Sequence, residues 1–316
     1  MKNIRRPRIV VAGSANTDMI VHVPHIPKPG ETVLGSEFRT AAGGKGANQA
    51  VAAARAAGGG CEVVFIGRVG DDAFGKNALK GLARENIRTD FLTTDENSPS
   101  GVALIAVDGK GENAIAVASG ANAAISASDM ERASDIIAES SLLLVQLEIP
   151  LPAVVRAAEI AAANGVPVML NPAPVPPAGI GDDLLRNIAW LTPNETEAET
   201  LSGIRFGAQS ESDAAADALL DRGVDAVLIT LGAGGVFAAS GKERFHFPAF
   251  PVQAVDTTAA GDVFNGALAV ALVEGKTLHE AVRFASAAAA LSVTRPGAQP
   301  SIPGRAEIND FLAGHR

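Results

Sequence analysis

The sequence predicts an α/β protein in which helices cover both faces of a mostly parallel central sheet, with a small β-sheet lid. Short apolar runs alternate with alanine-rich amphipathic segments along most of the 316 residues, a pattern typical of βα units and a parallel sheet. Two other regions, about 17–40 and 101–118, hold extended segments and no helical pattern within them. With 47% apolar and 19% charged residues, the composition is that of a compact globular enzyme. We expect one domain spanning 1–316.

The elements of the main layer follow in order along the chain. Ligands of such open sheets collect at the carboxyl ends of the strands, so the polar loops after the strands are candidate sites. The apolar runs predict strands at 9–13, 61–66, 142–146, 168–171, 188–191 and 226–230. The amphipathic segments predict helices at 46–57, 72–86, 127–138, 152–164, 196–202, 211–222, 261–274 and 277–291.

The lid is predicted from residues that alternate or are separated by turn signals. Residues 19–23 alternate like a half-covered strand, prolines and a glycine mark a turn after them, and 31–40 reads as another extended segment. Residues 101–107 and 113–118 are joined by a short turn-rich connection, which predicts a β-hairpin. Such a small sheet leaves exposed edges, so we expect the lid to close over the ligand and to pair with the lid of a second chain in a homodimer.

Charge and apolar-segment length argue against two function classes. The formal net charge of −9 argues against a nucleic-acid-binding surface, which needs clustered Lys and Arg. No uninterrupted apolar stretch reaches the roughly 18 to 20 residues that span a bilayer, and Gly13, Asn16 and Asp18 interrupt the first apolar run, unlike a signal peptide. The single cysteine, Cys61, favours a reducing compartment. We therefore expect a cytoplasmic protein that binds neither nucleic acid nor membrane.

The sharpest local pattern is the segment 256–266, Asp-Thr-Thr-Ala-Ala-Gly-Asp-Val-Phe-Asn-Gly, which opens directly into a helix. Small residues allow the backbone to approach a ligand, and the first N–H groups of a helix have no internal partner. Because such a helix N-terminus attracts anions, the segment predicts a phosphate site. From these residues alone, Asp262 is equally well explained as a carboxylate that caps the helix.

This segment resembles the C-terminal signature of the ribokinase family, also called the phosphofructokinase-B family of carbohydrate kinases. Residues 43–50, Gly-Gly-Lys-Gly-Ala-Asn-Gln-Ala, are similar to the family's sugar-binding loop, and 67–75 carries its Gly-Asp-Asp-x-x-Gly turn. Further matches are the Asn-x-x-Glu element at 192–197, the nucleotide loop at 230–235 and the tail at 297–301. The resemblance spans nearly the whole chain with its elements in the expected order.

The resemblance implies a ribokinase-like fold and ATP-dependent phosphorylation of D-ribose at the O5 hydroxyl, giving D-ribose 5-phosphate and ADP. In that reaction positioning and charge stabilisation dominate. Asp262 would accept the sugar hydroxyl proton, and the backbone N–H groups of Ala260, Gly261 and Asp262 would form an anion hole. The sugar contacts implied are Asn16, Asp18, Gly44, Lys45, Gly46, Ala47, Asn48, Glu148 and Asp262.

The same resemblance implies ATP, Mg²⁺ and K⁺ as co-substrate and cofactors. Asn194 and Glu197 would act on Mg²⁺ through water, although by themselves they fit a helix N-cap with an acid in the first turn. Ala259 departs from the glycine that many family members have there. The ATP contacts implied are Asn194, Thr230, Leu231, Gly232, Ala233, Gly234, Gly235, Gly261, Asp262 and Ser286; the K⁺ site would use Asp256, Thr258, Ser292, Arg295, Gly297 and Ser301.

Three alternatives stay open at this point. Glu148 taken alone reads as a surface residue at a strand end. The substrate could be 2-deoxyribose, fructose or a nucleoside, although a nucleoside base calls for stacking partners and the chain has no Tyr and one Trp. A non-catalytic sugar-binding protein on the same fold is a different class, which the intact segment around Asp262 disfavours.

Overall fold

The computed structural model describes residues 6–206 and 209–315. Within them, nine strands form the central sheet in the order β13-β12-β11-β10-β9-β8-β1-β4-β5. From β5 to β11 neighbouring strands pair in parallel, and β12 and β13 are added antiparallel at one edge. The strands are β1 (Arg8–Ala12), β4 (Glu62–Gly70), β5 (Arg88–Asp95), β8 (Leu142–Gln146), β9 (Val168–Asn171), β10 (Trp190–Leu191), β11 (Ala226–Thr230), β12 (Val236–Ser240) and β13 (Arg244–Phe247).

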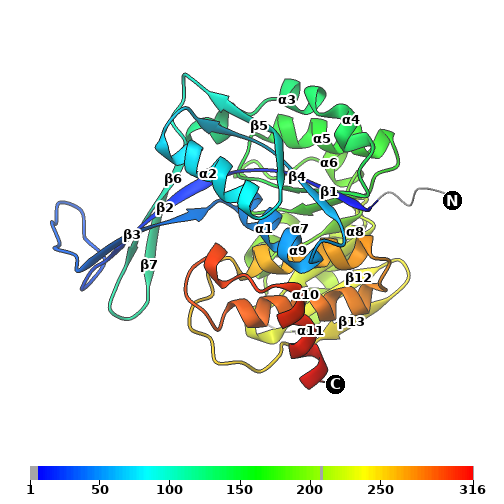
Figure 1. Ribbon diagram of the computed structural model, residues 1–316. Helices are drawn as coiled ribbons and strands as arrows, with labels where there is room; N and C mark the ends of the chain where they lie inside the picture. Colours follow the sequence, from blue (N-terminus) through cyan, green and yellow to red (C-terminus); the bar gives the residue numbers. More distant parts are fainter. Residues whose placement is uncertain (1–5, 207–208, 316) are drawn as a thin grey trace.

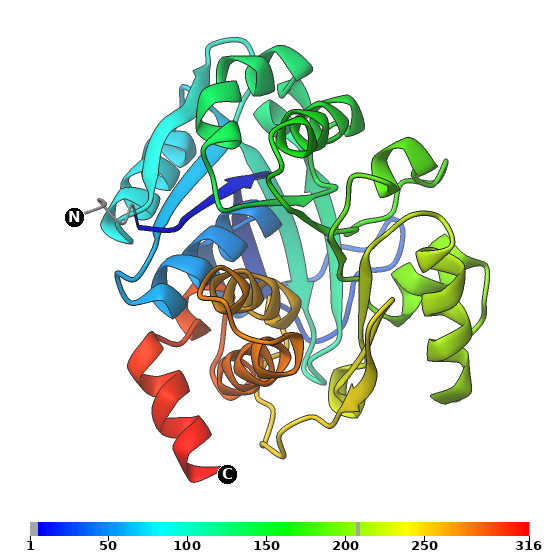
Figure 2. The ribbon, with the colours of Figure 1, turned by 90° about the vertical axis from the view of Figure 1, so that its right-hand side faces the viewer.

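Helices cover both faces of this sheet, as Figures 1 and 2 show. Because successive strand residues point to opposite faces, Ile9 and Val11 pack into one core while Val10 and Ala12 pack into the other. The first core is covered by α1 (Lys45–Ala57), α2 (Ala73–Arg84), α9 (Ala260–Val273), α10 (Leu278–Ser292) and α11 (Arg305–Gly314). The second is covered by α3 (Ala127–Arg132), α4 (Ser134–Ala138), α5 (Leu151–Ala163), α6 (Asp182–Leu185), α7 (Glu195–Ser202) and α8 (Gln209–Leu220). The predicted fold class is thus confirmed.

A second, smaller sheet stands beside the main body (Figure 1). It has the order β3-β2-β6-β7 and contains β2 (Asn16–His22), β3 (Glu37–Gly43), β6 (Gly101–Val107) and β7 (Asn113–Ala118). The β2–β3 and β6–β7 pairs are antiparallel, whereas β2 and β6 run parallel. The hairpin has the predicted bounds. Residues 31–36 lie outside the sheet, because a local turn in which Glu31 N–H donates to the Lys28 carbonyl occupies the chain before β3.

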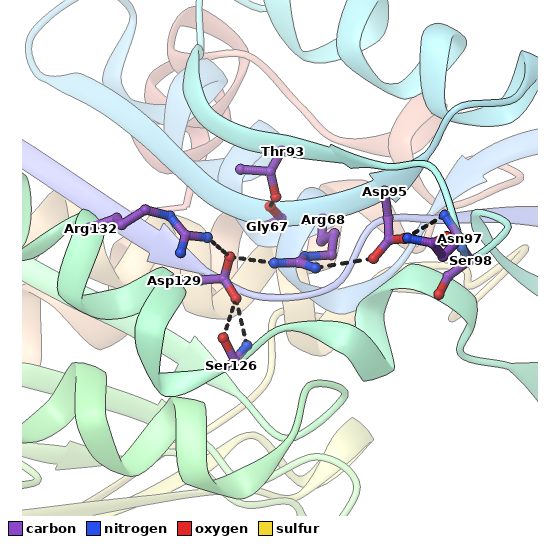
Figure 3. A network of polar contacts seen from close by, with 9 residues as sticks. All are labelled: Gly67, Arg68, Thr93, Asp95, Asn97, Ser98, Ser126, Asp129 and Arg132. Carbon is purple, nitrogen blue, oxygen red and sulfur yellow. Dashed lines mark hydrogen bonds and ion pairs between the residues drawn. The ribbon is translucent and has the colours of Figure 1, made fainter.

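Ion pairs hold the segment that leads into β6 (Figure 3). Arg68 on β4 donates to Asp95 at 3.0 Å and to Asp129 at 2.6 Å. Asp95 also accepts the backbone N–H groups of Asn97 and Ser98, at 2.8 and 3.0 Å. The network therefore ties β4, the end of β5 and α3 together at the base of the small sheet.

Some elements differ from the sequence-based expectation. The helix predicted at 127–138 is broken into α3 and α4 at Ala133, whose φ of −98° departs from helical values. Pattern reading missed β5, β12, β13, α6 and α11. β5 carries charged residues at both ends, and α6 is only four residues long, so neither has a strong periodic signal. The remaining short turns are 3₁₀ helices at Gly120–Ala124, Gly232–Gly234 and Gln299–Ser301.

Candidate active site

The candidate site lies where the main sheet ends and α1 and α9 begin. Gln146 and Asn171 are the last residues of β8 and β9, and Thr192 directly follows β10. These strands are neighbours and parallel, so their carboxyl ends bring the three polar side chains together beneath the two helix N-termini. This is the edge at which open α/β sheets bind ligands.

Asp262 is held by side-chain amides. It lies in the first turn of α9 and is 6% exposed. Its Oδ2 accepts from Asn48 Nδ2 at 3.0 Å and its Oδ1 from Gln49 Nε2 at 2.9 Å. Both oxygens thus have partners on α1, so the side chain does not serve as the cap of its own helix. Burial raises the pKa of Asp262, while Lys45 and the two amides oppose that rise.

Lys45 is the cation of the site. It is the first residue of α1. Burial opposes its charge, but the carboxylates of Asp262, Glu148 and Glu197 raise its pKa above the ordinary value. The lysine is therefore protonated. It interacts with Glu148, which the sequence analysis assigns to the sugar, and with Glu197, which it assigns to Mg²⁺.

Glu148 is built into the N-terminus of α1. Its Oε2 accepts from Ser14 Oγ at 2.6 Å and from the backbone N–H of Lys45 at 3.0 Å. The alternative of an isolated surface residue is therefore wrong. Gly44 adopts a φ of +89°, and a Cβ at Gly46 would lie 2.6 Å from the backbone nitrogen of Ser14, so both glycines are needed for this close approach.

Asn16 and Asp18 enter the site from β2. Both are buried, at 8% and 9% exposure. Burial, helped by the nearby carboxylates of Glu148 and Asp262, raises the pKa of Asp18 from 3.8 to about 6. Asn16 lines a cavity of about 370 Å³ together with Asn122 and Glu148.

Asn122 was not predicted from the sequence. Its Nδ2 donates to Asn16 Oδ1 at 2.7 Å, and its own Oδ1 accepts from Ala15 N–H at 2.9 Å. It thereby fixes which end of the Asn16 amide is available to a ligand. Gln49 was also missed as a site residue, although it lies within the predicted sugar-binding loop. The signal in the sequence that could have identified it is that Gln49 is a polar residue in a helix made mostly of alanine and other small residues.

A second cavity, of about 500 Å³, lies on the other side of the α9 N-terminus. Apolar groups such as Phe250 and Val293 form much of its wall. Ser286 also lines it, and the buried side-chain oxygen of this serine has no hydrogen-bond partner in the described residues. This volume and lining suit a nucleoside. From the predicted ATP set, Thr230, Gly232, Ala233, Gly235, Gly261 and Ser286 line this cavity.

The rest of the predicted ATP set lies around this cavity. Leu231 packs against the second core, and Gly234 accepts a hydrogen bond from His246 at its carbonyl. Asn194 pairs with Thr230 in a short β-bridge. Asn194 also forms a capping box with Glu197, with hydrogen bonds of 2.8 and 2.9 Å. Burial raises the pKa of Glu197.

The loop before α9 has an unusual backbone. Asp256 accepts from the N–H groups of Thr258 and Gly297, at 2.9 and 2.7 Å, which brings the two predicted K⁺ segments together. Ala259 has a φ of +61°, and the side chain at this N-cap position makes no capping hydrogen bond. This left-handed geometry explains why glycine suits the position. Ala260 and Gly261, the first two residues of α9, line the 500 Å³ cavity.

A buried carboxylate in the first turn of a helix, next in sequence to a residue that lines a nucleoside-sized cavity, is typical of a kinase that phosphorylates a small molecule. The chain belongs to the pfkB family of carbohydrate kinases, whose model matches residues 6–305. A ribokinase of Haemophilus influenzae is 48% identical over 308 residues, covering 97% of this chain and 99% of the relative.

Solved structures agree with this family and fold. The ribokinase of Thermotoga maritima has a TM-score of 0.87 at 42% identity, covering 96% of this chain and 99% of its own. The ribokinase of Arabidopsis thaliana, solved with ribose and ATP, has a TM-score of 0.87 at 35% identity, covering 98% and 99%. The chain is therefore a carbohydrate kinase with the ribokinase-like fold.

Proposed function

We propose that this chain transfers the γ-phosphoryl group of ATP to the O5 hydroxyl of D-ribose, giving D-ribose 5-phosphate and ADP. The observation that carries the proposal is the place of the buried Asp262 carboxylate. It lies within electrostatic reach of Asp18 and Glu148 and next in sequence to Gly261, which lines the nucleoside-sized cavity. A sugar hydroxyl and a terminal phosphate can therefore meet at this carboxylate.

Asp262 acts as the general base. Hydrogen bonds from the side-chain amides of Asn48 and Gln49 favour the ionised form of Asp262. An amide does not give up a proton, so the proton that the carboxylate accepts comes from the sugar hydroxyl. The N–H groups of Ala260, Gly261 and Asp262 stabilise the charge that develops on the transferred group, as a helix N-terminus does for any anion. Lys45 supplies a positive charge on the same side.

Sugar recognition comes from groups at the β2 and α1 ends. Asn16 has its Oδ1 occupied by Asn122, so its Nδ2 is the end that donates to the sugar. Asp18 and the free oxygen of Glu148 accept from hydroxyl groups. The Gly44–Asn48 part of the α1 N-terminus adds backbone and amide groups. A closed site of this kind disfavours a sugar that lacks one hydroxyl, because its buried polar groups then stay unpaired.

We propose Mg²⁺ and K⁺ as the cofactors, on the residues that the family resemblance implies. Asn194 and Glu197 would hold Mg²⁺ through water, and the ion would neutralise phosphate charge during transfer. Asp256, with oxygens of Thr258, Ser292, Arg295, Gly297 and Ser301, would hold K⁺ near the start of α9. The meeting of the 256–258 and 297 segments supports this donor set.

The proposal extends to the organisation of the protein. The chain is one domain with a lid, and the small sheet closes over the sugar. Two copies associate through their lids. In the described residues, no helix combines the length and apolar character that a membrane crossing requires, and we propose a cytoplasmic location.

A coupled ADP-release assay tests the function. The substrates are ribose, 2-deoxyribose, fructose, adenosine and no added sugar, each with Mg²⁺ in K⁺ or Na⁺ buffer, and NMR of the product locates the phosphate. We expect the highest kcat/KM for ribose, phosphate on O5, and lower turnover without K⁺. Preference for another sugar would reassign the substrate, and ADP release that is independent of any sugar would contradict the kinase assignment.

A further inference from the structure

A chain of buried amides runs beneath the candidate active site. Gln146 donates to Gln49 at 2.7 Å, and Gln49 donates to Asn171 at 3.0 Å. Asn171 donates to the Thr192 carbonyl at 3.0 Å. Thr192 Oγ1 donates to Asn265 Oδ1 at 2.5 Å, and Asn265 Nδ2 donates to the Gly261 carbonyl at 2.8 Å.

Every bond of this chain points the same way. The donors run from the end of β8 through α1 and the ends of β9 and β10 to the first turn of α9. From Gln146 to the Thr192 carbonyl the bonds are arranged head to tail, and in a low-dielectric interior such bonds polarise and strengthen one another. The side chains of Gln146, Gln49, Asn171, Thr192 and Asn265 are at most 7% exposed, so water has little access to the bonds between them.

These hydrogen bonds fix the orientation of the Gln49 side-chain amide. Its Oε1 accepts from Gln146, so its Nε2 has two hydrogens left, one for Asn171 Oδ1 and one for Asp262 Oδ1. The reversed amide would place Oε1 against two acceptor oxygens. Gln49 has no exposed surface, so its side chain can touch Asp262 but not a bound substrate.

We propose that Gln49 is a positioning residue for phosphoryl transfer: it holds the Asp262 carboxylate in one orientation and couples it to the backbone of Gly261. The base and the anion hole are consecutive residues at the start of α9. The hydrogen-bonded series donates to both of them, at Asp262 Oδ1 and at the Gly261 carbonyl. One hydrogen-bond network therefore contacts both the base and the backbone of the anion hole.

The main test replaces Gln49 with a residue of similar shape that cannot hydrogen-bond. The inference rests on the proposed function, so all rates are taken on the sugar that wild-type protein uses best. In Gln49→Met we expect kcat to fall about 10- to 100-fold, because a small displacement of a catalytic group has this effect. KM for sugar and for ATP should stay within about threefold, since Gln49 contacts neither.

A charged isostere gives a second, independent readout. Gln49→Glu places a carboxylate against Asp262, and neighbouring carboxylates raise the apparent pKa of one of them. The other charged groups that face this position are Lys45 on α1, Glu148 after β8, Glu197 on α7 and Asp18 on β2. Because the base must be ionised, the acid limb of the kcat profile should move to higher pH by about one unit or more.

Control variants separate positioning from loss of stability. Gln146→Met removes the partner that orients Gln49 without touching Asp262, and it should lower kcat in the same direction but less. Asn164→Ala removes an amide hydrogen bond to the Ile160 carbonyl at the end of α5, away from the site, and should leave kcat unchanged. If Gln49→Met does not fold, Gln146→Met and Thr192→Val, which breaks the link to Asn265, take its place.

The inference is overturned if folded Gln49→Met keeps kcat within about twofold of wild type, or if Asn164→Ala loses as much. It is also overturned if the lower kcat is matched by an equal rise in KM, or if both replacement variants turn over normally. Absence of wild-type turnover on every sugar would instead reject the proposed function. The two failures are therefore distinguishable.

Discussion

At the scale of single residues, the carboxylate of Asp262 has the most direct test. We expect Asp262→Asn to bind ATP and sugar and to lose about 10²- to 10⁴-fold in kcat, because an amide cannot accept the hydroxyl proton. Removal of a buried charge whose pKa is raised by burial should leave the fold intact. The measurements are kcat, the thermal midpoint and ATP affinity. A folded variant with near-wild-type kcat would rule out the role of base.

Asp18 is expected to act on the sugar rather than on ATP. Loss of a hydrogen bond to a charged group in a closed site is worth about 1.5 to 3 kcal/mol, so Asp18→Ala should lower kcat/KM for ribose by roughly 10- to 150-fold. ATP affinity should change little, because Asp18 is on β2 and is not among the residues that line the 500 Å³ cavity. Normal kcat/KM for ribose in this variant would show that the carboxylate is not a sugar ligand.

The raised pKa of Asp18 also predicts a pH-dependent stability difference. Burial raises its pKa in the folded state to about 6, from the ordinary value of 3.8. The folded state therefore holds this proton more tightly, and the wild-type protein loses stability as pH rises from about 4 to 6. Asp18→Asn lacks this loss, so its thermal midpoint should exceed that of wild type most clearly above pH 6. Midpoints are compared at pH 4 and 8, and an equal difference at both would contradict the assignment.

At the scale of elements, the crossing of α1 and α9 sets the site. A Cβ added at Gly266 on α9 would lie 2.5 Å from Ala52 Cβ and 2.6 Å from the Gln49 carbonyl. The two helices therefore approach so closely only because this residue is glycine. Asn48 and Gln49 on one helix and Asp262 on the other depend on that approach.

We expect Gly266→Ala to destabilise the protein by about 1 to 3 kcal/mol, as overpacking does, and to lower kcat because Gln49 is pushed from Asp262. Gly81→Ala on α2 is the matched control, since nothing lies within 4 Å of a Cβ there. That change should be neutral or stabilising by up to about 1 kcal/mol. Denaturant unfolding and steady-state rates of both variants check the pair, and equal effects would contradict the packing argument.

At the scale of the whole molecule, the small sheet carries the proposed dimer contact. All six residues of its edge strand β7 are exposed, with Ile115 at 57% and Val117 at 54%. Apolar residues on an open edge strand favour pairing with another chain. The paired registers place these two side chains on the same face of the sheet as Asp18. A second chain at this edge would therefore lie close to the sugar site.

We expect wild-type protein to have the mass of a dimer in light scattering at micromolar concentration, and Ile115→Lys to shift it towards the monomer. The charge would have to be buried in the contact. Val255→Lys changes a similarly exposed apolar residue, 65% accessible and outside the small sheet, and should keep the wild-type mass. A monomeric wild type, or a dimer insensitive to Ile115→Lys, would contradict a contact through β7.

The sequence by itself determined the fold class, the family and several elements to the residue. The strands 101–107, 113–118, 142–146 and 168–171 were predicted with their observed bounds, because each is a compact apolar or alternating run with turn residues at its ends. It also indicated the residues of the sugar loop and of the start of α9, because small residues directly before a helix form a pattern that can be read from the local sequence. β12 and β13 were missed, since antiparallel strands added at an edge have little local signal of their own.

Only the tertiary structure decided what the polar residues do for one another. The sequence left Asp262 open as a helix cap, and the structure shows both of its oxygens bonded to amides more than 200 residues earlier in the chain. Gln146, Asn171 and Thr192 are separate strand ends in the sequence, and the order of β8, β9 and β10 in the sheet makes them neighbours. Hydrogen bonds act over about 3 Å, so partners far apart in sequence are set by sheet order and helix crossing, which no local pattern records.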